Sequence, residues 1–235
     1  MTLTHATWNC AKVMLSLTLP FQVIIKTDRP RNTHDFCNQQ ALEILKKDGL
    51  QGEGRILQSY LEALNRGSHW SDQGFKNISH YYNHAKATGL WHGPDAPTEC
   101  SYYFERSIKY WQSGHREKSI FYLGAACHIL QDLCVPHHAC GLVLSGHKFF
   151  EDWSRDNYHD FVVRLEGIYH VAPHACGWVK ENARISSHYL PELIQQKGLA
   201  SVERVAGILL QRTQRVTAGF LSFFFQRIKN PTLGR

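Results

Sequence analysis

The stretch 128-HILQDLCVPHHAC-140 gathers histidines, an aspartate and cysteines, all of them side chains that bind metals. His128 and Asp132 are four residues apart, so on a helix their directions differ by about 40° and both project from one face. Gln131 is predicted to point elsewhere. The Pro-His-His sequence at 136–138 breaks this helix and supplies two more histidines from a turn. The stretch therefore predicts a helix and a turn whose side chains can hold one metal ion or neighbouring ions.

The same spacing recurs in 147-HKFFE-151, where His147 and Glu151 are again four residues apart. One such pair alone is commonly a surface ion pair. Two pairs that flank a Pro-His-His turn instead indicate two antiparallel helices that hold metal in the core of a bundle. Nitrogen and oxygen ligands favour zinc, with manganese or iron as alternatives. The many carboxylates fit an open, catalytic site better than a closed structural one.

Apolar residues recur at helical spacing through most of the chain, which predicts an all-α fold. Helices are expected over 35–49, 54–67, 99–113, 115–134, 147–165, 174–190 and 201–228. Residues 68–98, rich in Gly, Asn, Ser, His and Pro, predict a long irregular loop, and such a loop in a compact domain is often functional. The sequence shows no repeat, low-complexity tract or convincing strand pattern.

The composition suits a single multi-helix domain over 31–235, with 43% hydrophobic and 20% charged residues in the whole chain of 235. The net charge of +6 is spread along the sequence and favours anionic partners without choosing among phosphate esters, acidic lipid and nucleic acid. The seven cysteines form no CxxC pair, so we expect mostly reduced, buried thiols.

The N-terminal segment 1–30 contains the apolar run 13-VMLSLTLPFQVII-25. This run is long enough for the apolar part of a signal peptide and too short to span a membrane. Pro20 interrupts it and no clear small-residue cleavage site follows, which favours a packed helix or a membrane-surface anchor over a cleaved signal. The compartment is left open.

Several blocks of the chain resemble, in order, the zinc-dependent phospholipase C family of bacteria, which includes bacillary phosphatidylcholine phospholipases and clostridial alpha-toxins. The similarity runs from about His34 to Tyr158. The matching blocks are the start at TH…QALEIL (33–45), SHYYN (79–83), FYLGAACHILQDLCVPHHA (121–139) and GHKFFEDW (146–153). An ordered set of this kind is far more specific than any one motif.

The resemblance implies an all-helical domain, of the type shared with P1 nuclease, that binds two or three zinc ions. The ligands that it implies for one ion are His138, His147 and Glu151. Those that it implies for a second ion are Asp72, His80, His128 and Asp132. Asp132 would bridge to a third ion shared with His34. In the family an N-terminal tryptophan completes that third site, whereas here Phe21 to Ile24 occupy the corresponding zone. His137 and Cys134 are extra candidate ligands beside the motif.

The resemblance also implies a phosphodiester hydrolase, most simply a phospholipase C that acts on glycerophospholipids at a membrane surface. Asp72 is the candidate general base. Tyr81 and Tyr82, with Trp91, are candidates to cover a choline-like cation, although packing alone also explains them. We expect neither a nucleic acid substrate nor an obligate protein partner. A single-strand-specific zinc nuclease and a non-catalytic, metal-stabilised helical domain remain as alternatives.

Overall fold

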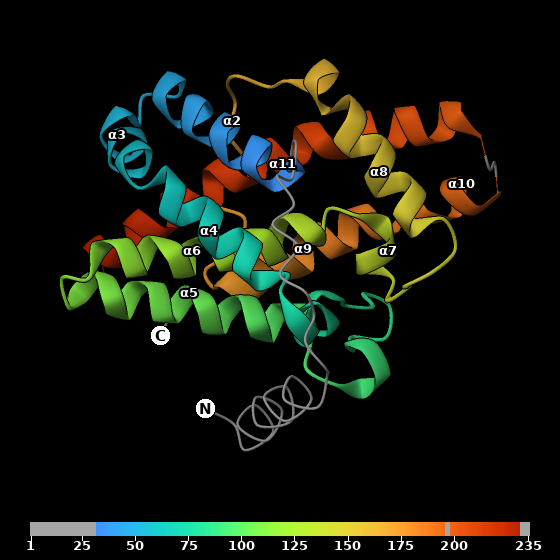
Figure 1. Ribbon diagram of the computed structural model, residues 1–235, viewed down its shortest axis with the longest axis horizontal. Coiled ribbons are helices and arrows are strands. Elements are labelled where there is room, and N and C mark those ends of the chain that lie inside the picture. The colour runs from blue at the N-terminus through green and yellow to red at the C-terminus, as the bar shows by residue number, and fades with distance from the viewer. Residues whose placement is uncertain (1–31, 196–197, 231–235) are drawn as a thin grey trace.

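The computed structural model describes residues 32–195 and 198–230, and within these ranges the regular structure is helical, as predicted (Figure 1). The α-helices are α2 (Thr33–Lys47), α3 (Gln51–Ser59), α4 (Leu61–Ser71), α5 (Ala96–Gln112), α6 (Arg116–Asp132), α7 (Pro136–Ala139), α8 (His147–Asn157), α9 (Ala175–Ser187), α10 (Leu190–Gln195) and α11 (Leu199–Lys229). Short 3-10 helices are η1 (Gly74–His80), η2 (Leu90–His92) and η3 (Tyr158–Phe161).

Helices α4, α5 and α6 pack side by side, and the long α11 runs behind α2 and α8 across the molecule (Figure 1). The contact between α4 and α6 is exceptionally close because it is made through glycines. A Cβ atom on Gly67 would lie 1.8 Å from the carbonyl oxygen of Phe121, and one on Gly124 would lie 1.9 Å from that of Leu64. This close approach fixes the end of α4, and with it Asp72, against the half of α6 that carries His128 and Asp132.

Among the described residues the hydrophobic core has two clusters. The larger one centres on Trp178, Phe104, Phe220 and Phe224, all fully buried. The smaller one lies between α8 and α11 and includes Phe150. Since truncating a buried phenylalanine or tryptophan typically costs about 3–5 kcal/mol, these clusters hold α8 and α11 firmly around the site described below.

Two of the expected helices end differently in the structure. The helix predicted over 54–67 is interrupted at Tyr60, whose φ of −119° and ψ of 17° separate α3 from α4. The helix predicted over 147–165 ends at Asn157, because the chain beyond it bonds to α11. The amide of Val163 donates to Oε1 of Gln214 (2.8 Å), which takes that segment out of a helical path.

The region predicted as an irregular loop, 68–98, is shorter than expected. Helix α4 continues to Ser71, and α5 already begins at Ala96, where the carboxylate of Asp95 accepts a hydrogen bond from the amide of Thr98 (2.9 Å). The Pro-His-His sequence is itself a short helix, α7, rather than a simple turn. The apolar run 13–25 and the proposed boundary near residue 30 lie outside the described residues. In the described ranges no helix is both long and apolar enough to cross a membrane.

Candidate metal centre

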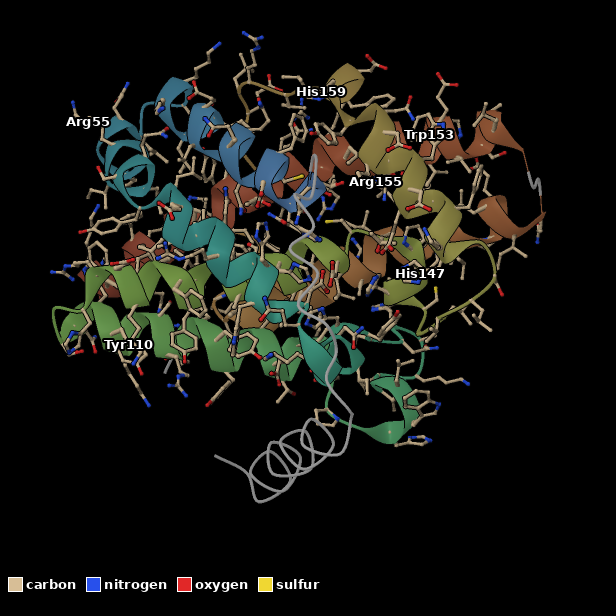
Figure 2. The ribbon with its side chains drawn as sticks, viewed as in Figure 1. Arg55, Tyr110, His147, Trp153, Arg155 and His159 are labelled. Carbon is tan, nitrogen blue, oxygen red and sulfur yellow. The ribbon has the colours of Figure 1, made fainter. Side chains whose placement is uncertain are left out.

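Helices α6 and α8 present the two His–acid pairs as the sequence predicts. His128 and Asp132 lie on the buried face of α6, with 1% and 5% of their surface exposed. His147 is the first residue of α8, and Figure 2 shows it at the N-terminal end of that helix, beside α7. Glu151 follows one turn later on the same face, and α7 contributes His138.

One group of potential ligands joins α7 to α8. Nε2 of His138 and Nε2 of His147 lie 3.2 and 2.8 Å from the same oxygen, Oε1 of Glu151. The ring of Tyr81 stacks on that of His138, with 4.4 Å between centroids. These three ligand atoms are close enough together to hold a single ion.

A second group joins α6 to the end of α4 and to η1. Nε2 of His128 lies 3.3 Å from Oδ1 of Asp72 and 3.1 Å from Oδ2 of Asp132. Nδ1 of His80 lies 2.9 Å from the same oxygen of Asp132 and 3.9 Å from Oδ1 of Asp72. The four residues that the sequence suggested for a second ion therefore meet in space.

His34, near the start of α2, forms a third group with His128 and Asp132. Its Nε2 lies 3.5 Å from Oδ1 of Asp132, and its ring centroid lies 4.0 Å from that of His128. Asp132 thus turns one oxygen towards His34 and the other towards His80 and His128. That is the arrangement expected of a carboxylate that bridges two sites.

The ligand groups open into one cavity of about 1180 Å³. The side chains of Asp72 and Glu151 are each 44% exposed, whereas those of His80, His128 and Asp132 are nearly fully buried. The carboxylates of Asp72 and Glu151 therefore form the accessible edge of the site. Tyr81 also lines the cavity.

The other candidates from the sequence belong to none of these groups, although the ring of His137 stacks on that of His147. Tyr82 packs in the larger core cluster, and substrate contact by it stays a prediction. His137 turns Nε2 to the carbonyl oxygen of Ser145 (3.2 Å). Cys134 lines the cavity but belongs to none of the three groups. Trp91 is 77% exposed on η2.

Residues 33–198 match the family described as zinc dependent phospholipase C, a span of more than half the chain. The chain belongs to this family. Two solved structures share its fold. The alpha-toxin of Clostridium absonum superposes with a TM-score of 0.76 at 19% identity, over 87% of this chain and 65% of that one. The alpha-toxin of an avian strain of Clostridium perfringens gives a TM-score of 0.74 at 18% identity, over 86% and 65%.

The chain spans about 65% of the length of the toxins that it matches. No curated protein matches it in sequence. The match to the family model confirms the family membership predicted from the ordered blocks. The structure confirms the all-α fold.

Membership of a zinc-dependent family raises the question of whether these residues fit zinc. A histidine ligand needs one ring nitrogen with a free lone pair, and a hydrogen bond from the other nitrogen normally fixes this state. Nδ1 of His138 donates to the carbonyl oxygen of His80 (2.9 Å), which directs its Nε2 to Glu151. Nδ1 of His34 donates to Oε1 of Gln131 (2.7 Å), which leaves its Nε2 facing Asp132.

In the second group His80 carries the same signature, whereas Nδ1 of His128 is buried without a hydrogen-bond partner among the described residues. Nε2 of His80 contacts Oγ of Ser71 (3.2 Å), so Nδ1 is the nitrogen that faces the carboxylates. Nδ1 of His80 and Nε2 of His128 are both buried close to carboxylate oxygens. Neither nitrogen is aligned for a hydrogen bond with a described residue. Buried nitrogens that point between carboxylates without hydrogen bonds are expected where a cation is the missing partner. The donor set therefore fits zinc.

The electrostatics of this family member also favour a cation. Burial alone would lower the pKa of His128, but the carboxylates of Asp132 and Asp72 raise it to about 10. Burial would raise the pKa of Glu151, but hydrogen bonds from His138 and His147 lower it to about 2. The carboxylates thus favour positive charge at this position, which a divalent ion would supply directly.

Sequence reasoning missed the residues that hold the ligands in place. Gln131 is 97 positions from His34 in the chain, and its Nε2 also donates to Oδ1 of Asn38 (3.0 Å) and Oγ1 of Thr217 (3.2 Å). The side chain of Gln131 projects from α6 in a different direction from that of His128, as predicted, and it reaches His34 on α2. Ser71, beside His80, was not a candidate either. Only the packing of α2 and α4 on α6 brings these partners together.

Proposed function

We propose that the protein is a zinc-dependent phospholipase C, which hydrolyses the phosphodiester bond on the glycerol side of phospholipids to give diacylglycerol and a phosphorylated head group. The observation that carries the proposal is the convergence of three ligand groups on one cavity in a chain of this family. Mononuclear structural zinc sites are closed by four ligands, whereas these groups are edged by half-exposed carboxylates.

We assign the ligands as follows. His138, His147 and Glu151 would hold one zinc ion, and Asp72, His80, His128 and Asp132 a second. Asp132 would share a third ion with His34. When bound, zinc ions make water more acidic and neutralise negative charge on a phosphate. The residues before Asn32, from which the family completes the third site, lie outside the described part of the chain, and we propose two or three ions.

Asp72 is the proposed general base. Its carboxylate is at the end of α4, partly open to the cavity, where a substrate and water have access. Burial would raise the pKa of Asp72, but the neighbouring His128 lowers it well below its usual range, so the group is ionised at neutral pH. An ionised carboxylate at the edge of the site can orient water and accept its proton.

The remaining proposed roles concern the substrate. Tyr81 is the proposed head-group contact, and its position in the cavity wall and its stacking on His138 support that role. Tyr82 is retained as a candidate on the resemblance alone. The substrate would be taken from a phospholipid surface, with no obligate protein partner.

Zinc-loaded protein should release phosphocholine from phosphatidylcholine dispersed in detergent and should leave single-stranded DNA and RNA intact. The conservative variant Asp72→Asn keeps the size of the side chain but removes the base, so turnover should fall at least about 100-fold, the lower end of general-base contributions. Degradation of the nucleic acids with untouched lipid would replace the proposal with a nuclease.

A further inference from the structure

A second cavity lies beside the metal centre, between α8, α10 and the start of α11. It has a volume of about 450 Å³. Its walls are mainly apolar side chains, namely Phe149, Phe150, Leu193, Ile194 and Val202. None of its described lining residues is an acid, a lysine or an arginine. We call it the α8–α10 pocket.

The α8–α10 pocket is next to the ligands of the first group. The ring of His137, which lines the pocket, stacks on the ring of His147 with 5.1 Å between centroids and 17° between planes. Gly146 also lines the pocket and directly precedes His147. Phe150 lines both this pocket and the metal-centre cavity. A molecule bound at His147 is therefore separated from the pocket by one layer of side chains.

Large apolar side chains are exposed in the pocket wall and directly beside pocket residues in the sequence. Leu144 is 78% exposed, Phe149 56% and Leu199 59%. Phe149 belongs to the pocket wall, Leu144 precedes the pocket residue Ser145, and Leu199 follows the pocket residue Gly198. Grouped apolar exposure of this kind around a concave site is typical of surfaces that bind apolar ligands.

We propose that the α8–α10 pocket binds one hydrocarbon chain of the phospholipid while the phosphate lies at the metal centre. This inference rests on the proposed function. The pocket offers an uncharged, apolar interior and an apolar rim, which matches an alkyl chain. Its position beside His147 places it within reach of a chain whose phosphate is in the neighbouring cavity. The hydrocarbon chain thereby contributes to substrate binding as well as anchoring the phospholipid in the membrane.

The test uses the zinc-loaded full-length protein and a series of soluble probes, the butyl, hexyl, octyl and decyl esters of phosphocholine, each kept below its micelle concentration. Isothermal titration calorimetry measures the dissociation constant of each. Because burying one methylene is favourable by about 0.8 kcal/mol, affinity should rise about fourfold per methylene until the pocket is filled. Choline phosphate itself should bind more weakly than any of the esters.

The variant Ile194→Trp fills the pocket, and Ile208→Trp is its matched control. The two isoleucines are 37% and 38% exposed, but Ile208 lines neither this pocket nor the metal-centre cavity. Affinity should stop rising with chain length in Ile194→Trp and should keep rising in Ile208→Trp. Both variants should hydrolyse bis(p-nitrophenyl) phosphate, which has no alkyl chain, at the parent rate.

A second variant protects the test against misfolding. Phe149→Ser removes an exposed side chain of the pocket wall, so it should fold and should reduce the gain in affinity per methylene. The proposal is overturned if the parent shows no dependence on chain length, or if folded Ile194→Trp retains it. If the parent protein hydrolyses no phosphodiester, the proposed function fails. Even then, an affinity that rises with chain length in the parent but not in Ile194→Trp would support binding of the alkyl chain in the pocket.

Discussion

The substitution Gln131→Leu tests whether the hydrogen bonds behind the ligands govern zinc binding. Gln131 is 3% exposed and uses both ends of its amide, accepting from His34 and donating to Asn38 and Thr217. Leucine has a similar volume but makes none of these bonds. Nδ1 of His34 then loses the acceptor that fixes its tautomer, so its Nε2 is no longer held ready for zinc.

Two effects of different size follow from this geometry. Leaving buried polar partners unsatisfied should lower the free energy of unfolding by about 1–3 kcal/mol. Loss of an outer hydrogen bond to a histidine ligand typically weakens metal affinity by roughly 10–100-fold. We expect this loss for the zinc ion that we propose His34 and Asp132 share. The ion at His138 and His147 should be unaffected.

The assay is competition for zinc with a chromogenic chelator, together with the melting temperature of the metal-free protein. Gln214→Leu is the matched control, because Gln214 is also a buried glutamine that forms three hydrogen bonds, to Val163, Phe161 and Leu210. Gln214 belongs to none of the three groups of candidate ligands. Both variants should melt earlier, but only Gln131→Leu should release zinc more readily. Equal zinc retention in the two variants would refute the positioning role.

Three further predictions follow from the same structure. Protein kept away from chelators should contain at least two zinc ions per chain by elemental analysis, since two of the ligand groups are complete without any residue before His34; one ion or none would contradict the assignment. Asp132→Ala, checked for folding by circular dichroism, should lose activity by several orders of magnitude and His34→Ala much less, because Asp132 contacts His34 through one oxygen and His80 and His128 through the other. Equal losses would mean that the third site is essential. Gly124→Ala should lower the free energy of unfolding by about 1–3 kcal/mol or more, because the new methyl group would collide with the backbone of α4. The control Gly52→Ala has open space around it and should be neutral or stabilising by up to about 1 kcal/mol. Equal melting temperatures of the two variants would show that α4 and α6 can separate.

The sequence predicted the site best where the argument was local. The positions of His128 with Asp132, and of His147 with Glu151, follow from helical geometry, and the structure places each pair on one helix face. Asp72 and His80 could be singled out only through the ordered resemblance, because nothing local links η1 to α6. Their meeting depends on the glycine contacts that bring α4 against α6.

The sequence predicted least where long-range packing decides the local structure. The break at Tyr60 is not marked by a proline or glycine, and the end of α8 at Asn157 depends on hydrogen bonds to α11. Gln131 showed the same limit, since periodicity gives the direction of a side chain but not the partner it meets. The α8–α10 pocket likewise forms between segments about 50 residues apart, which no pattern along the chain reveals.

The most direct test of the proposed activity is the release of phosphorylated head group from phosphatidylcholine micelles by the zinc-loaded protein, measured beside Asp132→Ala and beside protein stripped of metal. We predict that the parent protein releases phosphocholine and diacylglycerol in equal amounts, and that both the variant and the stripped protein are nearly inactive, with zinc restoring only the latter. A zinc-loaded, folded parent that releases no phosphocholine, or a parent whose activity survives the loss of Asp132, would contradict the account.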